Sequence, residues 1–424
     1  MSETVLNQAR RAKAAARRLA TIGTDVKNAA LFAIADSLIG DAEAIRDANC
    51  EDMDAGLARG LSEALLDRLM LDPRRIEAMA LGLRQIAALP DPVGQVIDGS
   101  RRPNGLEIRR VRVPLGVIGI IYESRPNVTV DAAGLCLKSG NAAILRGGSE
   151  AIRSNRALTE ICARAAEGAG LPPDCIQSIA TTDRESALAL MRAEGLVDVL
   201  IPRGGDALKK SVLENARVPV LTSLGGNCHT YVDKSADLAM AGEIAFNAKV
   251  ARPSACNAME TLLVHAACAA EFLPAIARRL TEAGVEIRGC DRTCSLAPTA
   301  SDATDDDWAK EYLALTLAVR VVNTLDEALD HIARFGSGHS EAIVTRDLAA
   351  AHRFTHEVDA ACVYVNASTR FTDGFEFGLG AEVGISTQKL HARGPIGLAE
   401  LTTSKTIVHG TGQVRQSAIG SRQS

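Results

Sequence analysis

Cys256 is the residue of this chain whose type and surroundings best suit covalent chemistry. It lies in a turn of small residues between a segment with helical periodicity and an apolar, strand-like run. Lys249 and Arg252 precede the thiol, and Asn257 follows it. A thiolate is a usable nucleophile when nearby cations or backbone N–H groups stabilise its charge and its sulfur is accessible. These surroundings suit a nucleophilic cysteine, but on spacing alone a single cysteine is more often an inert packed thiol. The case for catalysis therefore depends on the rest of the chain.

Two turns have the composition of phosphate-binding loops, because each joins an expected strand to an expected helix through paired glycines. Glycines let a phosphate approach the backbone, and the free N–H groups at the start of a helix attract anions. Neither turn is a G-x-G-x-x-G or Walker A sequence, and a Gly-Gly turn alone is often only a structural connection. Two such turns on one sheet favour a dinucleotide site. The residues concerned are Arg146, Gly147, Gly148, Ser149, Gly204 and Gly205.

Asn127 follows a third expected strand. Its side-chain amide is suited to donate a hydrogen bond to an oxyanion that develops during acyl transfer. Asparagine is also among the best residues for capping the start of a helix, and a helix is expected over residues 128–138. From the local sequence alone, the capping role is favoured.

The composition is that of a globular enzyme with no general affinity for nucleic acid or membranes. The 424 residues suffice for two or three domains, and 47% of them are apolar while 23% are charged. The net charge of −5 gives no attraction to nucleic acid or to an anionic membrane surface. The longest apolar run, at residues 113–122, is far too short to span a bilayer.

The ten cysteines occur at irregular spacings. They form neither the paired C-x-x-C pattern of a zinc site nor the framework of a disulfide-rich domain. The basic N-terminal segment runs directly into helix-period sequence, which favours a first structural helix over a transit peptide. We therefore expect reduced thiols, no metal site and a cytoplasmic location.

The order of elements predicts an α/β fold. Residues 1 to about 98 are expected to form several amphipathic helices. From Pro114, expected strands alternate with expected helices as far as a strand at 218–222, and a second α/β region begins near Asn227. Such βαβ repeats produce a parallel sheet with helices on both faces, which binds ligands at the carboxyl ends of its strands.

These features occur in an order that resembles the aldehyde dehydrogenase superfamily, and within it the gamma-glutamyl phosphate reductases. The order is strand-Pro-Asn, strand-Arg-Gly-Gly, strand-Gly-Gly, Leu-Gly-Gly-Asn, a cysteine, Glu-Tyr-Leu and a glycine-rich carboxyl segment. The resemblance extends from about residue 5 to residue 410, and several blocks exceed ten residues. The resembling segments are residues 114–140, 226–233, 256–265, 336–345, 365–382 and 385–397.

The resemblance implies an aldehyde dehydrogenase-like α/β fold with a Rossmann-like parallel-sheet cofactor domain, an α/β catalytic domain and a small β extension used in oligomerisation. We place the NADP-binding domain at residues 1–98 and 114–230. The catalytic domain would comprise residues 231–400, and its C-terminal end could pack back on the cofactor domain. The oligomerisation extension and tail would comprise 99–113 and 401–424. Within the extension, Asn104-Gly105 predicts a hairpin turn with both central residues at positive φ.

The resemblance also implies the activity, which is NADPH-dependent reduction of L-glutamyl 5-phosphate to L-glutamate 5-semialdehyde with release of phosphate. This is the second step of proline biosynthesis. Cys256 would attack the acyl phosphate to form a thioester, while Asn127 and the Cys256 backbone N–H hold the oxyanion. Hydride from NADPH would then give a thiohemiacetal that releases the aldehyde. Glu311 matches the superfamily glutamate that holds the nicotinamide ribose.

Cofactor preference is implied by two positions. Arg146 and Ser149 fall where the superfamily has a lysine and a glutamate that binds the adenosine ribose. The loss of that carboxylate beside a retained cation would favour the 2′-phosphate of NADP, although Glu150 is only one residue away.

The glutamyl end of the substrate is expected at Ser368, Thr369 and Arg370, since an arginine can bind a carboxylate through two parallel hydrogen bonds. An ordinary surface loop is the alternative for these residues. A homo-oligomer is expected, with glutamate 5-kinase as a candidate protein partner.

Three other functions remain open. A hydrolytic NAD(P)-dependent aldehyde dehydrogenase uses the glutamate of a Glu-Leu-Gly-Gly motif to activate water, and Ser223 stands at that position here. A cysteine hydrolase or acyltransferase would need a histidine partner for Cys256, which the sequence does not identify. A non-catalytic member of the fold is disfavoured by the presence of Cys256, Asn127 and Glu311.

Overall fold

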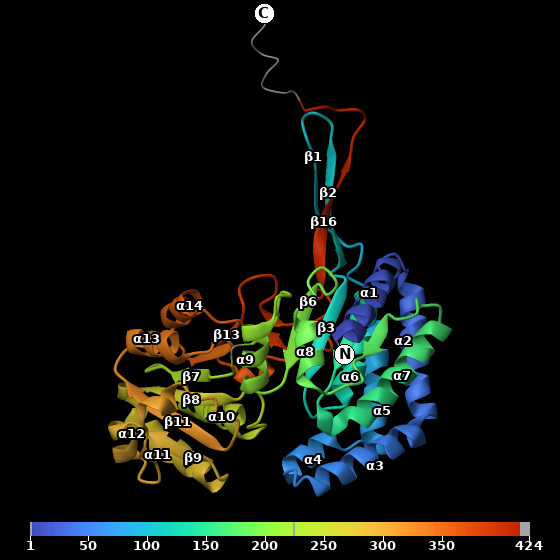
Figure 1. Ribbon diagram of the computed structural model, residues 1–424. Helices are drawn as coiled ribbons and strands as arrows, with labels where there is room; N and C mark the ends of the chain where they lie inside the picture. The colour runs from blue at the N-terminus through green and yellow to red at the C-terminus, as the bar shows by residue number, and fades with distance from the viewer. Residues whose placement is uncertain (1, 224, 416–424) are drawn as a thin grey trace, which may run out of the picture. The chain divides into compact units, whose positions relative to one another are not determined.

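The computed structural model describes residues 2–223 and 225–415, and the chain divides into two compact units (Figure 1). The first unit comprises Met1–Arg203, Val212–Val220 and Gly397–Ser424, and the second comprises Gly204–Ser211 and Leu221–Ile396. Each unit contains its own parallel sheet with helices packed around it, which confirms the predicted α/β class. The predicted domain boundaries, part of which fall at residues 416–424 outside the described ranges, stay predictions.

The sheet of the first unit has the strand order β5-β4-β3-β6 and is parallel throughout. Its strand β3 is apolar and buried along its whole length, as a parallel sheet covered on both faces requires. The strand expected at 218–222 does not form, and only Val220 makes an isolated bridge, to Leu200. Pro219 has no N–H to donate to a ladder there. The strands are β3 (Val117–Tyr122), β4 (Ala142–Arg146), β5 (Ile176–Ser178) and β6 (Val199–Arg203).

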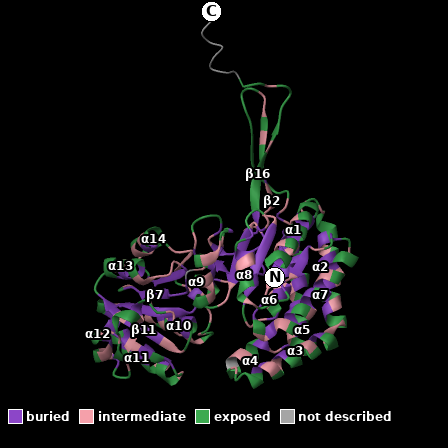
Figure 2. Ribbon diagram, in the orientation of Figure 1, coloured by how far each residue is buried: buried purple, intermediate pink, exposed green. Residues whose placement is uncertain are grey.

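Helices of the first unit pack against this sheet. The expected N-terminal helices are present as α1 to α5. Helices α6 and α7 pack on the strands and are backed by α2 and α5, while α1 contacts both the sheet and α8. Figure 2 shows the buried inner surfaces of these helices and their exposed outer surfaces. The helices are α1 (Ser2–Leu19), α2 (Thr24–Gly40), α3 (Ala42–Ala58), α4 (Glu63–Leu69), α5 (Pro73–Ala88), α6 (Asn127–Lys138), α7 (Ile152–Gly168) and α8 (Arg184–Met191).

A carboxylate on α3 accepts hydrogen bonds from the N–H groups at the start of α7. Asp52 is 1% exposed, and its Oδ2 accepts hydrogen bonds from the Ser154 N–H and hydroxyl, both at 2.8 Å. Its Oδ1 lies 3.3 Å from the Arg153 N–H. The first N–H groups of a helix have no partner within the helix, so Asp52 provides the cap from another element.

An antiparallel ribbon of three strands, in the order β1-β2-β16, joins distant parts of the chain. Its strands are β1 (Val96–Arg101), β2 (Glu107–Pro114) and β16 (Thr402–His409). The predicted hairpin between β1 and β2 is confirmed, but Gly105 alone of the two central residues has positive φ, at 88°. Most of the ribbon is exposed (Figure 2).

The second unit holds a parallel sheet of strand order β10-β9-β11-β8-β7-β12-β13. Strands β7 and β8 lie inside it and are almost wholly buried. The strands are β7 (Cys228–Val232), β8 (Met259–His265), β9 (Glu286–Gly289), β10 (Ser301–Asp302), β11 (Thr316–Val322), β12 (Ser340–Val344) and β13 (Cys362–Val365). A small separate pair is β14 (Ile385–Ser386) with β15 (Gly394–Pro395).

Apolar helices cover this second sheet. Helices α10 and α11 pack against β8 and form one continuous core with β9 and β11. Across the described ranges, no helix is both long enough and apolar enough to cross a membrane. The helices are α9 (Asp206–Asn215), which starts in the second unit, α10 (Leu238–Val250), α11 (Ala266–Glu282), α12 (Asp291–Leu296), α13 (Leu325–Phe335) and α14 (Leu348–Glu357).

The cap on α7 gives a prediction about stability. Asp52→Ala leaves buried N–H groups of α7 without acceptors and should lower the free energy of unfolding by about 2–3 kcal/mol. The matched control is Glu51→Ala, which removes a neighbouring carboxylate that pairs with Arg153 at the surface. That change should cost less than about 1 kcal/mol. Chemical denaturation of both variants measures the difference, and equal losses would rule out the cap as the cause.

Candidate active site

Cys256 lies in the short segment between α10 and β8, and it is half-buried. Helix α10 is started by Asp237, whose carboxylate accepts from the N–H groups of Ala239 and Met240. After the helix, the Ala255 N–H donates to the Arg252 carbonyl at 3.1 Å, so the chain turns tightly just before the thiol. The small residues of the sequence therefore produce the accessible turn that was predicted.

The loop with the expected substrate residues lies next to this turn. The Asn257 side-chain amide donates to the carbonyls of Arg370, at 3.2 Å, and Thr372, at 2.9 Å. In return, the Thr369 hydroxyl donates to the Asn257 carbonyl at 2.7 Å. Ser368 accepts from the Arg370 N–H and begins a short 3-10 turn. Two of the three residues chosen from the sequence, Thr369 and Arg370, thus contact the residue after the thiol.

The guanidinium of Arg370 provides positive charge near the thiol. Burial lowers the pKa of Arg370, repulsion from Arg252 lowers it further, and attraction to Cys256 opposes both. The buried Arg370 Nε has no hydrogen-bond partner among the described residues. An anionic group of a substrate would supply that partner. Lys249 does not contribute in this way, contrary to expectation, because its ammonium is buried against Glu260.

Buried polar groups support the turn from within the unit. The Cys228 thiol donates to the Cys256 carbonyl at 3.3 Å, and burial raises the pKa of Cys228 well above its usual value. His339 Nδ1 lies 3.7 Å from Cys228 Sγ and 2.8 Å from the Ser340 hydroxyl. Burial lowers the pKa of His339 to about 4, so this ring is neutral at physiological pH.

Glu311 and the Gly225-Gly226 segment both lie beside the backbone of Cys256. A Cβ on Gly226 would lie 2.1 Å from the Cys256 carbonyl oxygen and 2.5 Å from Glu311 Oε1, so only glycine fits there. Ser223 donates from its hydroxyl to the Gly225 carbonyl at 2.9 Å and accepts from the Gly225 N–H. Its neighbour Leu224, part of the motif in the sequence, lies outside the described residues.

The reactive segments of the second unit precede their strands. Cys256 comes before β8, Gly226 before β7, Glu311 before β11 and His339 before β12, and these four strands are neighbours in the sheet. The site therefore gathers at the amino ends of the strands. The expectation of ligands at the carboxyl ends of strands was made for the sheet that begins after Pro114, and it stays a prediction.

In the first unit, the Arg146 turn follows the carboxyl end of β4 as expected. A Cβ on Gly147 would lie 2.0 Å from the Asn155 amide nitrogen, and one on Gly148 would lie 2.3 Å from a Glu150 oxygen. A side chain at either position would approach these atoms too closely, which explains why both residues are glycines. The Glu150 carboxylate accepts from the Ser124 N–H at 2.6 Å and from its hydroxyl at 2.7 Å. The cofactor role of Gly147 and Gly148 stays a prediction.

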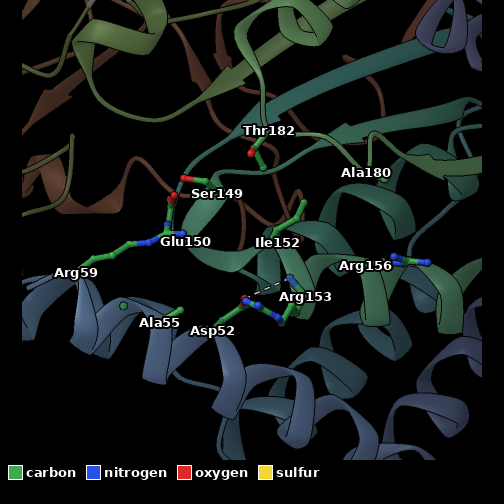
Figure 3. A pocket seen from close by; sticks show the side chains of 11 residues that line it. Asp52, Ala55, Arg59, Ser149, Glu150, Ile152, Arg153, Arg156, Ala180 and Thr182 are labelled. Atoms are coloured by element: carbon green, nitrogen blue, oxygen red, sulfur yellow. Dashed lines mark hydrogen bonds and ion pairs between the residues drawn. The ribbon is translucent and has the colours of Figure 1, made fainter. Parts of the chain in front are cut away.

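A cavity of about 340 Å³ opens beside this turn. Figure 3 shows Arg59 extending from the end of α3 toward the Ser149–Glu150 turn, with Thr182 on the opposite side. Arg59 forms no ion pair within residues 2–223 and 225–415, whereas Arg153 is engaged by Asp52 and Glu51. The lining residues are Asp52, Ala55, Gly56, Arg59, Ser149, Glu150, Ile152, Arg153, Arg156, Ala180 and Thr182.

Arg146 borders the same region. Its Nη2 donates to the Thr182 carbonyl at 2.8 Å, and its buried Nε has no partner in the described chain. Burial lowers the pKa of Arg146, while Asp183 and Glu150 oppose that change. Sequence reasoning missed Arg59, because an exposed arginine at a helix end carries no local signal of a binding role.

Asn127 is the first residue of α6 and is exposed. Its side chain does not cap the helix, since the N-cap position is Pro126. Instead, Asn127 Nδ2 donates to Asp131 Oδ2 at 3.0 Å, and burial raises the pKa of Asp131 to about 6. One N–H of the Asn127 amide therefore donates to Asp131, and this hydrogen bond fixes the direction in which the second N–H points.

The second Gly-Gly turn joins β6 to α9, as expected. The Gly205 carbonyl accepts from the Leu208 N–H at 3.1 Å in the first turn of α9. Among the described residues, no group of three or more histidine, cysteine, aspartate or glutamate side chains is arranged to hold a metal ion.

Comparison with known proteins shows to which family the chain belongs. The model of the aldehyde dehydrogenase family matches residues 2–316. The gamma-glutamyl phosphate reductase of Moorella thermoacetica is 62% identical over 412 residues, which cover 97% of this chain and 99% of the relative. That of Halothermothrix orenii is 57% identical and covers 98% of this chain and 100% of the relative. The chain belongs to the gamma-glutamyl phosphate reductase family, within the aldehyde dehydrogenase superfamily.

Solved structures agree with this placement. The crystal structure of the gamma-glutamyl phosphate reductase from Thermotoga maritima superposes with a TM-score of 0.96 at 48% identity, covering 97% of this chain and all of that one. The aldehyde dehydrogenase-like fold predicted from the sequence is therefore confirmed. The chain is an oxidoreductase of this family, while the roles of its single site residues stay predictions.

The contact between Asn127 and Asp131 gives a prediction for a reductase assay. Asn127→Ala should lower kcat/KM by about 10²–10³-fold, because an oxyanion would lose a donor. Asp131→Ala should lower it about tenfold in the wild-type background and have little further effect when combined with Asn127→Ala. Steady-state kinetics of the two single variants and the double variant test this. Additive losses would show that Asp131 does not act through Asn127.

Proposed function

We propose that the chain reduces L-glutamyl 5-phosphate to L-glutamate 5-semialdehyde and releases phosphate, with NADPH as the cofactor. The observation that carries the proposal is the half-buried thiol of Cys256, with Arg252 and Arg370 close by and the predicted substrate loop hydrogen-bonded to Asn257. Relatives bearing the reductase name cover nearly the whole chain, which supports the same activity.

The thiolate of Cys256 attacks the acyl carbon, the bond to the phosphate oxygen breaks, and phosphate leaves with its electron pair. The products of this step are a thioester on Cys256 and inorganic phosphate. Positive charge from Arg252 and Arg370 favours the thiolate over the thiol. A backbone N–H at Cys256 and the second amide N–H of Asn127 are the proposed donors to the oxyanion.

Bound NADPH would supply the hydride that converts the thioester to a thiohemiacetal. The Cys256 sulfur then leaves as the thiolate, and the aldehyde is released. Ser223 stands where hydrolytic relatives have a glutamate base, and its hydroxyl is engaged with the Gly225 backbone. Without that base, water attacks the thioester slowly, so the thioester persists for reduction or for phosphate in the reverse direction.

We propose that the cavity of the first unit binds the 2′-phosphate of NADP. Arg59 forms no ion pair in the described ranges, and the Arg146 Nε is unpartnered there, so positive charge is available to an anion. The carboxylates nearby are engaged elsewhere, Glu150 by Ser124 and Asp52 by Ser154. Ser149, Gly204 and Gly205 are the other proposed cofactor contacts, and Glu311 is proposed for the nicotinamide ribose.

Ser368, Thr369 and Arg370 are proposed to bind the amino-acid end of the substrate. A hydrolytic aldehyde dehydrogenase remains the second candidate, but the engaged hydroxyl of Ser223 supplies no base for it. We further propose that the chain forms a homo-oligomer through the exposed strands β1, β2 and β16. We also propose that it acts in the cytoplasm and that glutamate 5-kinase is a candidate partner.

The proposed thioester gives a test in the reverse direction. With glutamate 5-semialdehyde and NADP, cofactor reduction should depend on added phosphate and fall by at least about 10³-fold in Cys256→Ala. Cys50→Ala, which removes an exposed thiol, is the matched control and should keep full activity. Turnover without phosphate would contradict the reductase function, and an active Cys256→Ala variant would contradict the mechanism.

The cavity gives a test of cofactor preference. Arg59→Gln should raise the KM for NADPH at least about tenfold and change that for NADH little, since only NADPH carries the 2′-phosphate. Arg164→Gln, on α7 and paired with Asp41 at the surface, removes the same charge outside the cavity and should change neither value. Equal changes for both cofactors in Arg59→Gln would remove Arg59 from 2′-phosphate binding.

A further inference from the structure

A buried ion pair closes the segment that carries the thiol. Lys249 lies at the end of α10 and Glu260 near the start of β8, so Cys256 is between them in sequence. Lys249 Nζ and Glu260 Oε2 are 2.6 Å apart, and both side chains are completely inaccessible to solvent. The pair thus fixes the two ends of the turn against each other.

The second oxygen of the same carboxylate holds a different segment. Glu260 Oε1 accepts a hydrogen bond from the Leu313 N–H at 3.1 Å. Leu313 has a φ of +52°, a left-handed conformation that is unfavourable for a residue with a side chain. Such a conformation persists only where surrounding contacts impose it, and the buried carboxylate is one such contact. Leu313 is two residues from Glu311.

Glu311 in turn lies against the nucleophile's backbone. Its Oε1 and the Cys256 carbonyl oxygen both approach the position that a Cβ on Gly226 would occupy, at 2.5 and 2.1 Å. The Lys249 ammonium also lies 5.9 Å from the centre of the Tyr312 ring, between Glu311 and Leu313 in sequence. One buried carboxylate therefore touches both the Cys256 segment and the Glu311 segment.

We propose that Glu260 is a positioning residue that sets Glu311 relative to the Cys256 turn through its bond to the Leu313 N–H. The consequence for catalysis rests on the proposed function, in which Glu311 holds the nicotinamide ribose and Cys256 carries the thioester. Glu260 would then align the hydride donor with the acyl group without touching either. Removing it should slow hydride transfer and leave acylation of the thiol unchanged.

The energetics fit a positional role better than a stabilising one. Burial raises the pKa of Glu260 to about 7 and lowers the pKa of Lys249, with their mutual attraction opposing both changes. Replacing a buried ion pair by apolar residues of similar size is often neutral or stabilising. A methionine pair would fill the same space, but it could not accept a hydrogen bond from Leu313.

Two double variants isolate that hydrogen bond. Lys249→Met with Glu260→Met removes both charges and the acceptor for the Leu313 N–H. Lys249→Met with Glu260→Gln removes the same charges but keeps an amide oxygen as the acceptor. Both avoid an unpaired buried charge, and thermal unfolding and circular dichroism establish that both fold. The two variants therefore differ at one side chain, and only glutamine keeps an acceptor for the Leu313 N–H.

Two assays are made on each variant. Acylation of Cys256 by p-nitrophenyl acetate needs no cofactor, while single-turnover reduction with NADPH reports the hydride step. The Met/Met variant should acylate at the wild-type rate and lose at least about tenfold in the hydride step, whereas the Met/Gln variant should stay within about threefold of wild type. Hydrogen exchange at the Leu313 amide should accelerate in the Met/Met variant only.

The proposal is overturned if the Met/Met variant transfers hydride at the wild-type rate, or if the Met/Gln variant is impaired as much as Met/Met. Failure of the proposed function is a separate result, because the wild-type protein itself would then show no NADPH-dependent reduction. In that case, hydrogen exchange at Leu313 still decides the structural part. Unchanged exchange in the Met/Met variant would contradict it.

Discussion

The amide of Asn257 is the contact on which the arrangement around the nucleophile depends. It donates to two backbone carbonyls of the 370–372 loop, at 3.2 and 2.9 Å, and the backbone carbonyl of Asn257 accepts a hydrogen bond from the Thr369 hydroxyl. A thiol can react only if it is reachable, so the turn that holds it cannot be fixed by apolar packing over the sulfur. Hydrogen bonds to the backbone on either side fix it instead, and they bring Arg370 close to Cys256.

The two units differ in which of their charged side chains are paired with neighbouring groups. In the second, Lys249 and Glu260 neutralise one another out of water, so Arg252 and Arg370 supply the positive field near the thiol. In the first, Asp52 and Glu150 are occupied by N–H and hydroxyl donors, which leaves Arg59 available in the cavity. Positive charge is thus concentrated at a few arginines on a chain whose net charge is −5.

Periodicity predicted most of the elements, because strands buried on both faces are continuous apolar runs and helices alternate with them. It failed at 218–222, where Pro219 breaks the ladder and the apolar residues pack without a strand. Nor did it predict that the segment of Cys256 lies at the amino end of the sheet of the second unit. Chain direction within a sheet is a tertiary property that local sequence does not carry.

Cys256, Glu311 and the 368–370 loop could be singled out from the sequence as candidate site residues, but their partners in the structure could not. Arg59 is an exposed arginine, and nothing in the sequence around it indicates a binding role. The contact between Asp131 and Asn127 depends on the rotamers of both side chains, which the sequence does not give. Glu260 did have a signal, since a carboxylate in an otherwise apolar strand must find a buried partner. That partner, Lys249, was instead expected to face the thiol.

The central claim is that a thioester on Cys256 survives long enough for reduction or for attack by phosphate. Peptide mass spectrometry after mixing the protein with glutamate 5-semialdehyde and NADP, without phosphate, tests it most directly. The account predicts a glutamyl adduct on Cys256 that persists in buffer and disappears when phosphate is added. An adduct on another residue, or one that water removes as fast as phosphate does, would contradict it.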